Sequence, residues 1–324
     1  MSAGLSRLMG LVAGAAIGAL LLWIAFRQAD VAAVAQTLRH GDWTLPAFGL
    51  LVGTLLYVTS KAVRWRWLLG GAPEVRLRDL LKPTVAGLAL NALLPHAGEF
   101  VRAASLQRRH GYVTAAVLAS IVAERVFDLV AVLLLGATAL STVAVPGPMV
   151  AALRVMAWLA ALGAALMVAL WLRPAPFRKG IRQCTRPLPA RWQERVLDEF
   201  DAAVGAFGVV RSPRTAAVVL LWSLFQWLAI ALCAGCAARV VGVPVGASAA
   251  LLVVEGIVVA FLLPNAPGYA GSVQLAFVMS LGASGVAPVP ALAASVVYQA
   301  LMIGPVVIVG LAVLPASLRR DPAP

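Results

Sequence analysis

LNALLPHAGEFVRAASLQRR, residues 90–109, is the stretch that decides the predicted fold. It ends an apolar run at 84–94 that is too short to cross a bilayer, which takes about 20 apolar residues. Pro95 then breaks the helix, because proline donates no amide hydrogen bond and clashes with the preceding turn. Charge follows at once, since Glu99 and Arg102 share one face of a resumed helix. The stretch therefore predicts a broken membrane segment with a polar site, to which Asn91 and Gly98 also belong.

The composition places the chain among polytopic membrane proteins. Of its 324 residues, 62% are hydrophobic and 12% are charged, whereas soluble domains have about 45–50% apolar and about 25% charged residues. The net charge is +13, and its Lys and Arg residues gather in short clusters between apolar segments. This pattern is typical of cytoplasmic loops that face anionic lipid. It favours membrane lipids as partners and gives no reason to expect nucleic acid.

The apolar segments predict an all-α membrane bundle that forms one domain over residues 1–324. We expect about six full spans and two re-entrant hairpins, roughly eight hydrophobic segments in all. The full spans are expected at 8–26, 45–69, 113–139, 149–172, 215–237 and 291–314. An amphipathic piece at 30–39 and a basic cytoplasmic connector at 173–214 lie between them.

Two of the spans carry charges. The span at 45–69 ends with Arg64 and Arg66 between tryptophans, which indicates either an interfacial anchor or a contact with lipid phosphate. The span at 113–139 holds Glu124, Arg125 and Asp128 near its middle. Each charge at a helix centre costs about 2.5–3.5 kcal/mol, so we expect them to be paired, with Arg125 on Asp128, or hydrated. A structural ion cluster that locks two helices is the alternative to a functional site.

A second interrupted region completes an internal repeat. Residues 262–267 align with 93–98, and both start with Leu-Leu-Pro. With the basic loops on the cytoplasmic side, 45–139 and 215–314 each read as span, re-entrant hairpin and span in opposite orientation, which is an inverted repeat. The candidate site residues of the second half are Glu255, Asn265, Pro267, Gly268 and Gln274.

These motifs resemble the flippase-like membrane region of the lysylphosphatidylglycerol synthase family. The resemblance covers nearly the whole chain and rests on Asn91, Pro95, Gly98, Glu99 and Arg102, on Glu124, Arg125 and Asp128, and on Pro267 and Gly268. It implies movement of lipids or lipid-linked substrates between leaflets. Two departures stand out. The chain stops at Pro324 without the family's soluble domain, so lipid aminoacylation is not expected, and Gln274 stands where the family usually has a glutamate.

The resulting hypothesis is a lipid translocase of the bacterial inner membrane with both termini in the cytoplasm. Arg102 and Arg125 would meet an anionic head group, because guanidinium binds phosphate bidentately. The nearby carboxylates would orient those arginines or carry protons, while Asn91 and Gln274, together with Asn265, would supply neutral hydrogen bonds. The alternatives are a membrane enzyme acting on a lipid or polyprenyl-linked substrate, and a non-catalytic scaffold for a lipid-modifying partner. No cofactor and no metal site is expected.

Overall fold

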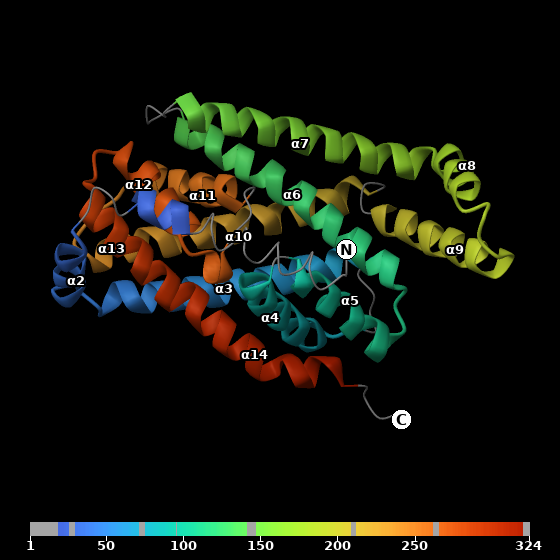
Figure 1. Cartoon of the computed structure of the whole chain (residues 1–324), viewed down its shortest axis with the longest axis horizontal. Coiled ribbons are helices and arrows are strands. Elements are labelled where there is room, and N and C mark those ends of the chain that lie inside the picture. Colours follow the sequence, from blue (N-terminus) through green and yellow to red (C-terminus); the bar gives the residue numbers. More distant parts are fainter. Residues whose placement is uncertain are drawn as a thin grey trace.

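The computed structural model of the chain describes residues 19–25, 30–70, 75–94, 96–140, 147–208, 212–261 and 266–319. These residues form helices joined by short turns, without a β-strand among them. The elements follow in the order α2 (Val31–Arg39), α3 (Leu45–Leu68), α4 (Leu77–Leu93), α5 (Ala97–His110), α6 (Thr114–Leu140), α7 (Gly147–Leu172), α8 (Pro174–Cys184), α9 (Ala190–Ala206), α10 (Pro213–Val240), α11 (Ala247–Phe261), η2 (Pro267–Tyr269), α12 (Ser272–Gly282), α13 (Pro288–Tyr298), η3 (Gln299–Ile303) and α14 (Gly304–Leu318). Figure 1 shows the long helices lying side by side.

Four described helical stretches are long and apolar enough to cross a membrane. They are Leu45–Leu68, Met149–Leu172, Pro213–Val240 and Pro288–Leu318. α6 has 27 residues and a length of about 40 Å, but it also contains three ionised side chains. The predicted spans at 45–69, 113–139, 149–172, 215–237 and 291–314 thus each coincide with long helical structure. The predicted span at 8–26 lies largely outside the described residues.

Both predicted helix breaks are confirmed. α4 ends at Leu93 and α5 begins at Ala97, and Leu94 between them is extended, as expected for a residue that precedes proline. α11 ends at Phe261, and the chain resumes through η2 before α12 starts at Ser272. In each case the two flanking helices pack against each other. We refer to α4–α5 as the first helix pair and to α11–α12 as the second.

Small residues let the helices of the bundle approach closely. α3 lies along α10, where Gly53 faces the Cys233 thiol so tightly that an added Cβ would lie 2.6 Å from the sulfur. α14 lies along α4, where a Cβ on Gly310 would overlap Ala89. Such contacts are typical of membrane helices, which associate through close van der Waals packing.

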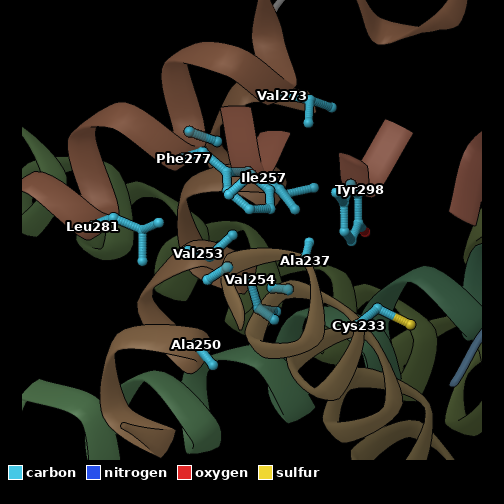
Figure 2. Close-up of a cluster of buried hydrophobic side chains, with 14 of the residues drawn as sticks. Cys233, Ala237, Ala250, Val253, Val254, Ile257, Val273, Phe277, Leu281 and Tyr298 are labelled. Atoms are coloured by element: carbon cyan, nitrogen blue, oxygen red, sulfur yellow. The ribbon is translucent and has the colours of Figure 1, made fainter. Parts of the chain in front are cut away.

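The larger apolar core lies in the second half of the chain. Figure 2 shows buried side chains from α10, α11, α12 and α13 meeting there, among them Val254, Ile257, Phe277 and Tyr298. A smaller apolar cluster surrounds Trp65, which is fully buried. The two clusters hold the broken helix pairs between long helices.

The last span differs from the expected continuous helix. The segment Gln299–Ile303 is a π-helix in which the Gly304 amide donates to the Gln299 carbonyl, five residues back. Pro305 follows directly and has no amide hydrogen, so it leaves one carbonyl of the preceding turn without its helical partner. The π-turn widens the helix at this point, and such turns are frequent at functional sites.

Candidate functional site

Glu124 is the centre of a buried ion network. Its side chain is 0% exposed. One carboxylate oxygen, Oε1, accepts from the Lys61 ammonium and lies 3.0 Å from Nη2 of Arg64. The other, Oε2, accepts from Nη2 of Arg102 at 2.8 Å. Three cations from α3 and α5 therefore converge on one carboxylate of α6.

Asp128 extends this network by one helical turn. Both of its oxygens accept from Arg64, with Nη2 at 3.2 Å from Oδ2. The indole of Trp227 donates to Oδ1 at 2.9 Å, and Arg64 Nη1 also donates to the Ser223 hydroxyl at 2.8 Å. The pair formed by Arg64 and Asp128 thus also ties α10 to α3 and α6. We call Lys61, Arg64, Arg102, Glu124 and Asp128 the inner network.

The spacing of these residues explains why they meet. Lys61 and Arg64 stand three residues apart on α3, and Glu124 and Asp128 stand four apart on α6, so each pair occupies one helix face. The two faces pack against each other. Arg102 is held in place by Trp65, since its guanidinium lies 4.0 Å from the indole ring centre. This cation–π contact fixes Arg102 while it donates to Glu124.

A second, more exposed ion pair borders the inner network. Nη2 of Arg125 lies 3.0 Å from Oε1 of Glu99, and the two side chains are 51% and 20% exposed. Nδ1 of His96, an exposed residue, lies 3.6 Å from the same Glu99 oxygen. The predicted pairing of Arg125 with Asp128 is wrong, because Asp128 faces Arg64 and Arg125 points toward α5. We call Arg125 and Glu99 the outer pair.

The first break is built around a very close backbone contact. The side-chain oxygen of Asn91 accepts from the Gly98 amide at 2.8 Å and so bridges the break. A Cβ on Gly98 would overlap the Gly87 carbonyl of α4, so only glycine permits this packing. His96 adopts a left-handed conformation with φ of 64°. Pro95, predicted to belong to the site, lies outside the described residues.

The second break is neutral where the first is ionic. Gln274 accepts from the Gly271 amide at 2.8 Å and donates to the side-chain oxygen of Gln299. Gln299 in turn donates to the Gly268 carbonyl at 2.9 Å. Gly268 has a φ of 73° within η2, which begins at Pro267. Asn265 lies outside the described residues.

The two breaks lie close to each other, because η2 packs against α4. The outer pair lies near this junction, since Glu99 stands in the first turn of α5, directly after the first break. Ionised side chains of the first half therefore lie close to the turn of the second half.

A comparison with models of known protein families identifies the family of this chain. The family model described as Lysylphosphatidylglycerol synthase TM region matches residues 11–310. The chain belongs to this family. No curated protein shows a significant match to the sequence of this chain. The family and the apolar helices together indicate a membrane protein with a lipid-related function.

Two residues expected at the site of this family member lie away from the ion network. Arg66 is half-buried and forms no ion pair with any described residue. Glu255 is fully buried on α11, where it lies against Gly136 of α6. Arg64 is 0% exposed, so both interpretations, the interfacial anchor and the contact with lipid phosphate, are wrong for this residue.

Sequence reasoning missed several residues that the structure brings to the site. Lys61 was visible as the partner of Arg64 at helical spacing, but Lys and Arg near tryptophans are also typical of a membrane interface. Ser223 and Trp227 carry no charge and lie in an apolar helix. Gln299 gave no signal beyond its polarity. The described residues contain no group of three His, Cys, Asp or Glu side chains that could hold a metal ion.

The charges of the site are unbalanced. The inner network and the outer pair together hold four basic and three acidic side chains, which gives one net positive charge. Three of the four cations are arginines, whose planar guanidinium presents two parallel donors to a phosphate or carboxylate. The arrangement is therefore suited to bind an anion through the exposed Arg125.

Proposed function

We propose that the protein moves lipids or lipid-linked substrates across the membrane, with the anionic head group passing along the ion network. The observation that carries this proposal is the net positive charge of a largely buried network whose outermost cation is half-exposed. A phosphate approaching Arg125 competes with Glu99 for the guanidinium. Because the pair is partly exposed, we expect exchange of its carboxylate for a phosphate to cost little.

We propose that the two halves of the chain form an inverted repeat, and the helix contacts within each half support this. Within each half, a long helix packs on the first arm of the broken pair, as α3 does on α4 and α10 on α11. The next helix packs on the second arm, as α6 does on α5 and α13 on α12. α3 and α10 lie along each other between the halves. We propose that both broken pairs are re-entrant, since transporters with inverted repeats bind substrate where interrupted helices meet.

We further propose an orientation and a location. The connector helix α8 and its flanks are rich in exposed arginine and lysine, which favours the cytoplasmic side by the positive-inside rule. That orientation puts both termini in the cytoplasm and fits a bacterial inner membrane. Anionic membrane lipids are the expected partners, with a lipid-modifying enzyme as a possible second one. We propose transport rather than catalysis.

The experiment is a leaflet-exchange assay in liposomes that contain the purified protein. Vesicles carry a trace of phosphatidylglycerol with a fluorescent acyl chain, and a membrane-impermeant reductant bleaches the outer leaflet. We expect the inner-leaflet fraction to become accessible faster than in protein-free vesicles. Fluorescent phosphatidylcholine, which has no net charge, should exchange more slowly. Equal rates in protein-containing and empty vesicles would refute the proposal.

A further inference from the structure

Glu255 stands out as a buried carboxyl group without a partner. Its side chain is 0% exposed, and neither Oε1 nor Oε2 has a hydrogen-bond partner among the described residues. The residue lies in α11, a short apolar helix of 15 residues. By contrast, the buried Glu124 accepts from two cationic side chains, and the buried Asp128 accepts from Arg64 and from the Trp227 indole.

The packing around Glu255 holds it in place. A Cβ on Gly136 of α6 would lie 2.6 Å from Oε1, so glycine at this position makes room for the carboxyl group. On the next residue, a Cβ on Gly256 would lie 2.5 Å from the Ser280 hydroxyl of α12. α11 therefore packs closely between α6 and α12, and the Glu255 side chain lies against α6. The neighbouring Val254 and Ile257 belong to the apolar cluster of Figure 2.

No counter-ion faces this carboxyl group from the helices packed against α11, which are α6, α7, α10 and α12. The ionised group of α6 nearest in sequence to Gly136 is Asp128, eight residues earlier and about 12 Å along the helix. α12 has no titratable side chain. α7 contributes only Arg154, which is exposed. The titratable and charged side chains of α10 are Arg214, Cys233, Cys236 and Arg239.

We propose that Glu255 is a proton-binding site, occupied in this conformation and emptied when α11 and α6 separate. An ionised carboxylate in an apolar interior without a partner is so costly that the group takes up a proton instead. Water that enters between α6 and α11 would solvate the carboxylate and release the proton. If the protein is a translocase, this exchange couples lipid movement to a proton gradient. The coupling rests on the proposed function, whereas proton binding does not.

Infrared spectroscopy of the protein in lipid nanodiscs tests proton binding directly. We expect the spectrum at pH 7 to contain the carbonyl stretch of a protonated carboxylic acid that disappears in Glu255→Gln. Glu194→Gln, an exposed site on α9, is the matched control and should leave that band unchanged. The amide should also fit the pocket without loss of thermal stability, because it mimics the neutral acid. A difference spectrum with carboxylate bands, or a strongly destabilised Glu255→Gln protein, would overturn the proposal.

The coupling is tested in the fluorescent phosphatidylglycerol vesicles with an imposed pH difference. One proton per lipid would shift the steady-state leaflet ratio by up to about tenfold per pH unit. We expect this shift in the native protein and in Glu194→Gln, and no shift in Glu255→Gln. Native exchange that is insensitive to the gradient would overturn the coupling. Absence of any lipid exchange would instead count against the translocase function. The infrared test of proton binding at Glu255 does not depend on that outcome.

Discussion

The two broken helix pairs solve the same backbone problem with opposite chemistry. Both are interrupted at a Leu-Leu-Pro motif in the sequence. Around the first pair, seven ionised side chains form the inner network and the outer pair. Around the second, two glutamines and backbone groups satisfy one another, and the carboxyl group of Glu255 has no hydrogen-bond partner in the part of the chain that the structure describes. The difference teaches that the site of this molecule is asymmetric even if its helices repeat.

The asymmetry has an energetic reason. Each isolated charge at a helix centre costs about 2.5–3.5 kcal/mol, and removing one member of a buried pair exposes its partner to that cost. Charges gathered into one network share donors and acceptors, whereas an amide network satisfies itself without ionisation. The anionic head group that we propose as substrate would thus meet charged side chains on one side of the junction and neutral ones on the other.

The largest expected effect is on stability when a charge of the first region is removed. Glu124→Gln leaves three buried cations around a neutral amide, and we expect it to lower the unfolding free energy by about 3–5 kcal/mol. Glu255→Gln in the second region should cost almost nothing. Thermal unfolding in detergent, with both variants side by side, measures the contrast. Similar losses of unfolding free energy in the two variants would contradict the proposed difference between the two regions.

The next effect concerns how closely the two helices within each broken pair pack against each other. Gly98→Ala pushes a methyl group into the Gly87 carbonyl, and because backbone must move, we expect a loss of about 3 kcal/mol. Gly256→Ala brings its methyl group to 2.5 Å from the Ser280 hydroxyl and only to 3.2 Å from the Ala276 backbone, and because the hydroxyl can move more easily than backbone, we expect a smaller loss of about 1 kcal/mol. Gly282→Ala has open space and is the control. If thermal unfolding showed that Gly98→Ala loses no more stability than Gly256→Ala, this order would be contradicted.

A smaller effect should link the glutamines of the second region. Gln274→Ala and Gln299→Ala each remove one side of their hydrogen bond. A double-mutant cycle on unfolding free energies should give a coupling of about 1 kcal/mol, the scale of hydrogen bonds between membrane helices. Additive losses would mean that the two side chains act independently. In that case the neutral network would not be a unit comparable to the ionic one.

The smallest stability effect is expected at the outer pair. Arg125→Ala removes a half-exposed ion pair that contributes about 0–1 kcal/mol, yet we expect it to abolish the charge preference in lipid exchange. Arg125→Lys keeps the charge but loses the planar fork, so it should restore exchange only in part. The assay is the fluorescent phosphatidylglycerol exchange with thermal stability measured in parallel. An Arg125→Ala protein with native exchange would assign the outer pair a structural role only.

Local physics made most of the fold predictable. Pro95 with the charges after it predicted the first break, Pro264 with the uncharged Pro267 and Gly268 after it predicted the second, and apolar run lengths predicted where the long helices lie. The π-turn at Gln299 was not predicted, because an apolar helix with a proline continues or kinks depending on its neighbours. The amphipathic piece at 30–39 became α2, capped by the Asp30 carboxylate, which accepts from the Ala32 amide.

The candidate site was predictable in its members but not in its pairings. Helical spacing would allow Arg125 to pair with Asp128, but the packing of α3 against α6 instead pairs Asp128 with Arg64. The burial of Lys61 and Arg64 depends on which face of α3 meets α6, which a single sequence does not specify. Neutral partners such as Ser223 leave no charge pattern to follow.

The contact between Gly87 and Gly98 has a mechanical consequence. Because the two backbones touch and Asn91 bridges them, α4 and α5 cannot shift relative to each other and must move as one rigid lever. Any movement of this unit relative to the rest of the molecule must then occur along its contacts with α3, α6 and α14. The lever carries Glu99 and Arg102 with it, so its displacement would separate both residues from their partners on α6 in a single stroke.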